Sequence, residues 1–276
     1  MKKTGLVLAI FCVFIFSNVY ATPSTHIWAP STDIQPYKKI HVTSDFYFPT
    51  TAKGTNADNY DQHNYVLQDY GLTFSLLSDK PEENLLGKLW KPLGKIMAET
   101  GFDYKKGLGS FYDSTPWYFH FKFGIPEGGY SRFTCPVGSM QSTPAIAFGV
   151  YDMGTRSHRT NYNIWYGKVA KTVDIGKVNL GRFSGGYFVG NGRLLRGRDG
   201  LRDNAGPMFA WERTISEISD KLWLCVDYQG TQSGYGAMNY GFAWSFTKDV
   251  SAILAYDIYN NRNLTDTITL QVDINF

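Results

Sequence analysis

The stretch from Leu264 to Phe276 constrains the fold of this chain more than any other segment. From Ile268 onward its even-numbered residues are apolar and its odd-numbered residues are polar. A β-strand points successive side chains to opposite faces, whereas a helix would spread this pattern around its axis. We therefore expect a strand with one face toward an apolar phase and the other toward water. A face strand of a soluble sandwich is the alternative.

The same alternation recurs upstream, in segments close to the roughly 9–11 residues that a tilted strand needs to cross a bilayer. We expect about twelve strands, with ten or fourteen as alternatives, because an even number returns both chain ends to the same side. The segments before the last are Lys38–Phe48, Tyr65–Leu77, Ile96–Tyr104, Pro116–Phe123, Ala145–Asp152, Tyr162–Lys171, Val178–Val189, Pro207–Ile215, Leu222–Gln229, Gly236–Phe246 and Val250–Tyr259.

Two of these segments carry one entirely apolar, aromatic-rich face. In the Pro116–Phe123 segment, Trp117 and Phe119 alternate with Tyr118 and His120. Soluble surfaces rarely tolerate contiguous apolar patches of this kind. The pattern therefore favours lipid outside and water inside over a carbohydrate-binding sandwich.

Alternating hydrophobic residues that end on a C-terminal Phe276 resemble the terminal signature of Gram-negative outer-membrane β-barrels, a porin-like class. The resemblance implies an all-β fold, a transmembrane antiparallel up-and-down β-barrel. It also implies a location in the cell outer membrane, with contacts to its lipid and lipopolysaccharide. The barrel assembly machinery would recognise the chain through Phe276.

The N-terminus has the features of a secretory signal, with Lys2 and Lys3 ahead of an apolar run. We expect residues 1–21 to be a signal peptide cleaved after Ala21, with an uncleaved anchor as the alternative. Residues 22–37 are predicted as a periplasmic lead-in and residues 38–276 as the barrel. No later stretch suits a transmembrane helix, so a membrane location requires a closed barrel.

Composition narrows the class of partner. Without Lys2 and Lys3 the 27 basic residues become 25 against 24 acidic ones, a formal charge of +1. This balance does not favour a nucleic-acid binder. The 19 Tyr, 19 Phe and 7 Trp suit aromatic girdles at the two membrane interfaces.

Two connections are longer than the short turns expected on the periplasmic side. Lys80 to Lys95 has helical spacing of its apolar residues and is predicted as an interfacial loop helix or, alternatively, a plug inside the lumen. Gly124 to Pro144 is turn-rich. It contains Cys135, which could pair with Cys225 if both lie in an oxidising compartment.

Charged residues collect on the inward faces of the expected strands. We interpret them as lining a narrow pore, since twelve strands lie between a filled interior and an open channel. Paired or hydrated charges without a transport role are the alternative. The predicted pore-lining residues are Glu99, Asp103, His120, Lys122, Arg182, Glu212, Asp227, Asp257 and Asp273.

An arginine-rich loop follows the strand that ends at Val189. We expect it either to fold inward as an anion-selecting constriction or to contact lipopolysaccharide, with a solvated loop as the alternative. Its predicted anion contacts are Arg193, Arg196, Arg198 and Arg202.

The predicted function is passive diffusion of small polar or anionic solutes through the lumen. A closed structural or adhesive barrel and a barrel hydrolase are the alternatives. We expect no enzyme, because none of the five histidines lies in a recognisable nucleophile motif. No cofactor, metal site or catalytic residue is predicted.

Overall fold

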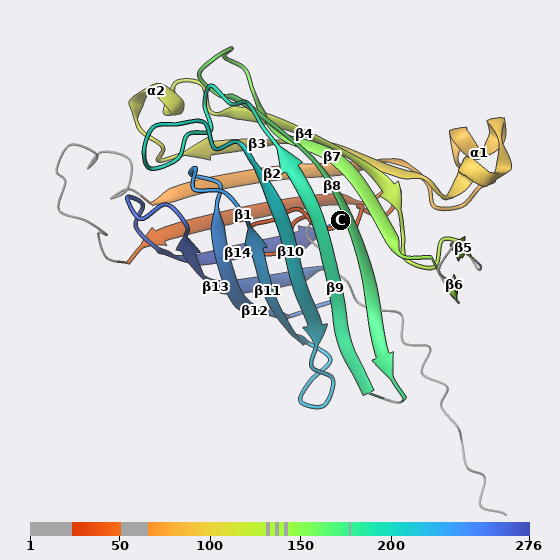
Figure 1. Cartoon of the computed structure of the whole chain (residues 1–276). Coiled ribbons are helices and arrows are strands. Elements are labelled where there is room, and N and C mark those ends of the chain that lie inside the picture. Colours follow the sequence, from red (N-terminus) through yellow and green to blue (C-terminus); the bar gives the residue numbers. More distant parts are fainter. Residues whose placement is uncertain (1–23, 51–65, 131–132, 136–137, 141–142, 177) are drawn as a thin grey trace, which may run out of the picture.

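The computed structural model describes residues 24–50, 66–130, 133–135, 138–140, 143–176 and 178–276. The predicted signal peptide lies outside these residues. Figure 1 shows an antiparallel barrel with α2 near one end and α1 and the β5–β6 hairpin near the other. Twelve strands close the barrel, as predicted, because β1 pairs with both β2 and β14.

Most predicted strands match the structure to within a few residues. The barrel strands are β1 (Ile40–Pro49), β2 (Leu67–Leu77), β3 (Met97–Lys106), β4 (Trp117–Ile125), β7 (Ala145–Gly154), β8 (Asn161–Ile175), β9 (Val178–Val189), β10 (Ala205–Thr214), β11 (Leu222–Gln229), β12 (Ala237–Ser245), β13 (Val250–Tyr259) and β14 (Thr267–Asn275).

Closure depends on the first and last strands. Along β1 and β14 the pairs run from His41 opposite Asn275 to Pro49 opposite Thr267. The start of β1 and the end of β14 therefore lie at the same rim of the barrel. This rim is called here the periplasmic end, and the opposite rim is called the outer end. The alternation seen in the sequence is preserved, since Thr269 and Gln271 are buried while Ile268 is 43% exposed.

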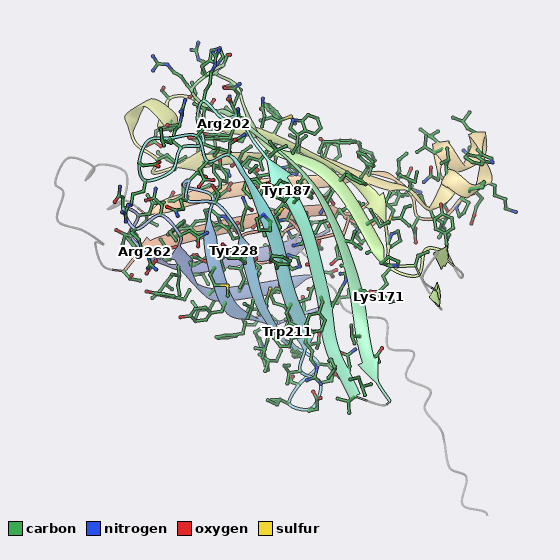
Figure 2. The ribbon with its side chains drawn as sticks, in the orientation of Figure 1. Lys171, Tyr187, Arg202, Trp211, Tyr228 and Arg262 are labelled. Atoms are coloured by element: carbon green, nitrogen blue, oxygen red, sulfur yellow. The ribbon has the colours of Figure 1, made fainter. Side chains whose placement is uncertain are left out.

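The outward face forms an apolar belt. The exposed residues of this belt include Phe119, Phe148, Phe209, Phe242 and Leu254. In Figure 2, Tyr187 and Tyr228 lie toward the end that carries Arg202 and Arg262, and Trp211 lies toward the other end. This is the aromatic-flanked outer surface of a membrane-spanning barrel.

The two long periplasmic connections contain most of the remaining small elements. The 78–96 connection forms α1 (Leu85–Leu89) and η2 (Lys91–Lys95), which contact each other outside the barrel wall and do not plug the lumen. The 126–144 connection contains β5 (Phe133–Cys135) and β6 (Gly138–Met140), which the sequence pattern missed. At the outer end, α2 (Ser110–Asp113) lies between β3 and β4. In the described part of the chain, no helix is long and apolar enough to cross a membrane.

The lumen is occupied by the chain itself. Residues 24–37, called here the luminal segment, were predicted as a periplasmic lead-in, but the structure places most of this segment inside the barrel. His26, Ile27 and Ala29 are at most 2% exposed, and Ile27 packs against Cys225 on the inner wall. Cys225 is a free thiol, so the alternative of a disulfide with Cys135 is not realised.

The belt yields a test of the membrane-facing surface. Leu254→Arg places a charge near the middle of β13, where an outward cation costs about 2–4 kcal/mol of folding free energy in a bilayer. Ile268→Arg, at the outer end of β14, is the matched control, with an expected loss of about 0–1 kcal/mol near the interface. Urea unfolding in lipid vesicles measures both. Equal losses at the two positions would contradict the assignment of depth.

Candidate functional site

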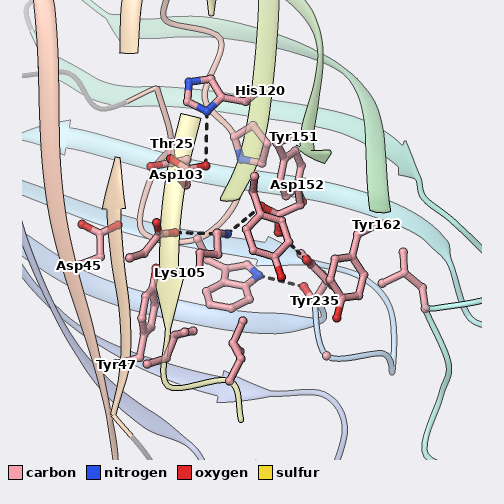
Figure 3. A pocket seen from close by; sticks show the side chains of 18 of the residues that line it. Thr25, Asp45, Tyr47, Asp103, Lys105, His120, Tyr151, Asp152, Tyr162 and Tyr235 are labelled. Carbon is pink, nitrogen blue, oxygen red and sulfur yellow. Dashed lines mark hydrogen bonds and ion pairs between the residues drawn. The ribbon is translucent and has the colours of Figure 1, made fainter. Parts of the chain in front are cut away.

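A cavity of about 670 Å³ lies in the outer part of the lumen. Its floor is formed by the luminal segment, including Ile27 and Trp28. Its walls are the inward faces of strands on both sides of the barrel, and loop residues 194–198 lie at its rim. Figure 3 shows carboxylates and tyrosines facing one another across this space.

The floor is held by one carboxylate of β11. Oδ2 of Asp227 accepts hydrogen bonds from the backbone N–H groups of Ile27, Trp28 and Ala29 at 2.8, 2.9 and 3.2 Å. Oδ1 of the same residue accepts from Asn239 of β12. Because the luminal segment has no regular secondary structure here, a side chain supplies the acceptor that a helix or sheet would otherwise provide.

A buried ion pair holds the other part of the luminal segment. Nζ of Lys122 lies 2.9 Å from Oε1 of Glu99, and both side chains are at most 3% exposed. The same ammonium donates to the carbonyl oxygens of Ser24 (3.0 Å) and Asp33, while Oε2 of Glu99 accepts from the N–H of Gln35. These contacts satisfy charges that would be costly to bury alone.

Further contacts come from β8, β9 and β10, which lie in the wall between β4 and β11. The Arg182 guanidinium of β9 contacts both carboxylate oxygens of Asp33 at 2.7 and 2.8 Å. Lys168 of β8 donates to the carbonyl of Pro30 at 2.8 Å, and His26 lies 3.4 Å from Glu212 of β10. The luminal segment is therefore anchored on β3, β4, β8, β9, β10 and β11, and it crosses the lumen.

Above this floor, an ammonium group lies between two carboxylates. Nζ of Lys105 is 2.7 Å from Asp152 and 3.2 Å from Asp69, and 5.4 Å from the centre of the Tyr118 ring. The Tyr235 hydroxyl donates to the other oxygen of Asp152. Burial, together with the Asp152 charge, raises the pKa of Tyr235 well above its ordinary value, so this hydroxyl stays a donor.

Asp45 adds a further carboxylate without a basic partner. It lies directly across from Asp69 in the β1–β2 ladder, and the Thr43 hydroxyl donates to it at 2.5 Å. Among the described residues, no lysine, arginine or histidine lies within ion-pair distance of Asp45. The outer lumen thus contains a carboxyl group that the described residues leave without a basic partner.

A hydrogen-bonded chain of three residues lies in the same wall. The Thr73 hydroxyl is 3.0 Å from Nε2 of His120, and Nδ1 of His120 is 3.4 Å from Asp103. Gly101 separates Thr73 from His120 in the ladders, and a Cβ there would lie 2.5 Å from Nε2. This is the order of a nucleophile, a base and an acid, but β2, β3 and β4 each pair on both sides, so their backbone amides are committed to the sheet and are not available as oxyanion donors.

The predicted pore-lining residues all face the lumen. Five of them contact the luminal segment, and two of these five, Glu99 and Lys122, also line the cavity. Glu99, Lys122, Arg182, Glu212 and Asp227 hold the luminal segment. The remaining four are divided between the cavity and the strand ladder. Asp103, His120 and Asp273 line the cavity, and Asp257 accepts from Thr267 and Thr269 of β14.

The arginine loop folds over the outer rim. Leu195 is buried against Ala29, which ties the loop to the luminal segment. Arg196 and Arg198 line the mouth of the cavity. The other two arginines bond within the loop region: Arg193 lies 3.1 Å from a ring nitrogen of His158, and Arg202 donates to Asn204.

Three charged residues of the cavity were not predicted from the sequence. Asp69 and Lys105 follow the inward parity of their strands and could have been found. Asp152 could not, because parity places it on the outward side with Ile146 and Phe148. A register shift in β7 and a φ of 52° at Asp152 turn its side chain into the lumen.

Comparisons with known proteins give only distant structural likenesses. No protein-family model matches the chain, and no curated protein matches it. Among solved structures, it is similar to the outer membrane protein Omp33 of Acinetobacter baumannii (10% identity, 86% of this chain and 98% of that one, TM-score 0.43). It is also similar to an outer membrane channel from Pseudomonas putida F1 (10%, 88% and 97%, 0.41) and to outer membrane phospholipase A from Escherichia coli (13%, 88% and 94%, 0.41). Scores this low leave the function to be argued from the site itself.

The anchoring of the luminal segment is testable by hydrogen exchange. Asp227→Ala removes the acceptor of three backbone N–H groups, each of which loses a charge-assisted hydrogen bond. We expect the amides of residues 27–29 to exchange about tenfold faster or more, since each tenfold corresponds to about 1.4 kcal/mol.

Asp257→Ala is the matched control, because it removes an inward carboxylate whose bonds go to threonines of β14. Exchange at residues 27–29 should not change in that variant. Unchanged exchange in Asp227→Ala would show that the contacts seen here do not hold the segment.

Proposed function

We propose that this protein is an outer-membrane channel for small polar solutes that is held closed by its own luminal segment. The observation that carries the proposal is the path of residues 24–35 across the lumen, bonded to strands on opposite sides. A solute entering from outside reaches the cavity and meets this segment. Passage then requires the segment to move.

The bonds that hold the segment suit a reversible gate. They are hydrogen bonds and ion pairs to polar walls, and water can replace them when the segment moves. The net contribution of each such bond is about 0.5–1.5 kcal/mol, or about 1.5–3 kcal/mol where a charge takes part. The apolar contacts of the segment are small clusters around Ile27 and Ala29.

The solutes that the lumen favours are cationic rather than anionic. Six carboxylates line the cavity, whereas the lysines on its wall are Lys105 and Lys122, both already paired. Arg196 and Arg198 stand at the exposed rim, where solvent screens them. We propose that these arginines contact phosphate groups of lipopolysaccharide, and that the acidic cavity sets selectivity.

Neither an enzyme nor a purely structural barrel is our first proposal. We propose no hydrolysis at Thr73, His120 and Asp103, because the strands provide no oxyanion donors. These three residues would instead hold the His120 ring in place. A closed adhesive barrel is consistent with the occupied lumen and is the alternative that the next experiment excludes or supports.

A disulfide lock tests the gate. Ile27 and Cys225 belong to one buried cluster, so Ile27→Cys in a Cys135→Ser background brings a second thiol into the cluster that contains Cys225. In planar bilayers, we expect discrete conductance steps from the reduced protein and none after oxidation, with recovery on reduction. Free-thiol titration verifies the bond.

The control carries Ile27→Cys and Cys225→Ser and receives the same oxidant, which should not change its conductance. Steps of unchanged size and frequency in the locked protein would mean that solutes do not pass the luminal segment. A correctly folded protein that is silent both reduced and oxidised would favour the adhesive barrel.

Reversal potentials test the charge preference. We expect a salt gradient across the wild-type protein to give a reversal potential of the sign set by cation flow, because the carboxylates attract cations into a narrow lumen. Arg196→Ala with Arg198→Ala should change it little. A potential of the opposite sign that these substitutions abolish would instead support the anion preference inferred from the sequence.

A further inference from the structure

We propose that the outer cavity is a binding site for a small organic molecule with a primary ammonium group, with the carboxylates of Asp45 and Asp69 receiving the ammonium and tyrosines covering the rest. The site is the vestibule of the proposed channel. Binding there does not require the gate to open, so it can be measured on the closed protein.

The pairing of charges around the cavity leaves room for one more cation. Glu99 is paired with Lys122, Asp273 with His41, and Asp103 with His120. Lys105 is shared by Asp69 and Asp152. Two carboxylates thus share one ammonium, and Asp45 beside them has none among the described residues.

The cavity already shows how it holds an ammonium group. Lys105 lies between two carboxylate oxygens and over the face of the Tyr118 ring. Carboxylates and aromatic faces are the groups that recognise ammonium ions in proteins. A second ammonium opposite it, between Asp45 and Asp69, would meet the same chemistry.

Several deeply buried polar atoms on the cavity wall have no hydrogen-bond partner among the described residues. Tyr118 is 1% exposed and Asp273 is 1% exposed, and both line the cavity. The Tyr118 hydroxyl and Oδ2 of Asp273 are unpartnered, as is Oδ1 of Asp69. Unsatisfied buried groups of this kind are uncommon, and they show that the cavity wall carries polar capacity that the described side chains do not use.

The shape and lining of the cavity define the body of the ligand. A volume of about 670 Å³ lies within the range of roughly 300–1,000 Å³ that is common for small-molecule sites. Tyr47 lies on one side of the space, and Tyr151, Tyr162 and Tyr235 lie together on the other. Their faces suit a planar or aromatic body and their hydroxyls suit a polar substituent. The ligand class is therefore a small aromatic or hydroxylated primary amine.

The test uses tyramine as the probe and isothermal titration calorimetry of the full mature protein folded in detergent. We expect saturable binding of tyramine and none of 4-hydroxyphenylpropionate, which has a carboxylate in place of the ammonium. Asp45→Asn should weaken tyramine binding about tenfold or more, because it replaces a charge-assisted bond by a neutral one.

Asp199→Asn is the matched control: it removes one negative charge from the outer loop without lining the cavity, and it should leave tyramine binding unchanged. Folding of each variant is checked by the shift in gel mobility on heating. Should Asp45→Asn fail to fold, Asp69→Asn takes its place, with the same expected loss.

Three results would each overturn the proposal: no tyramine binding, equal binding of the carboxylate analogue, or Asp45→Asn binding as tightly as the wild type. The proposed channel is judged separately by the disulfide lock. A barrel that binds tyramine but never conducts would remove the channel and keep the binding site, and a conducting barrel that ignores tyramine would do the reverse.

Discussion

The closed ladder of main-chain hydrogen bonds between β1 and β14 is the constraint on which the rest of the structure depends. In a bilayer, every backbone N–H and C=O group must find a partner within the protein, and a sheet achieves this only by closing on itself. Closure fixes an apolar outside and a polar inside. The interior of a twelve-stranded barrel is then too wide for wall side chains to fill it alone.

The luminal segment fills part of that interior. Its backbone makes few bonds of its own, so Asp227, Glu99 and Lys168 supply acceptors and donors from the wall. Charges that the wall would otherwise leave hydrated become the anchors of an irregular segment. The segment does not reach the carboxylates of the outer lumen and so does not neutralise them. The filled part of the lumen therefore contains paired charges, whereas the open part is acidic.

Much of the barrel was predictable from the sequence because strand parity is a local signal that lipid enforces on every strand. It gave the strand number and the inward faces of Glu99, Lys122 and Arg182. It failed at Asp152, where a register shift reverses the parity. It also gave no information on residues 24–37, since prolines and polar residues without period look alike whether they lie in the periplasm or in a lumen. The same limit applies to Cys135 and Cys225. Whether they form a disulfide depends on the distance between them in the fold, and the periodicity of the sequence carries no information on that distance.

The position of the luminal segment, directly before β1, has a consequence for the order of assembly. β1 is also the strand that closes the cylinder against β14, and Gln271 of β14 binds the carbonyl of Ile27. The segment must therefore be enclosed as the seam zips shut or be threaded into a finished cylinder afterwards. If the segment is enclosed, it can serve as a template for closure. The first and last strands of the sheet would then contact the segment before the last hydrogen bonds between them form.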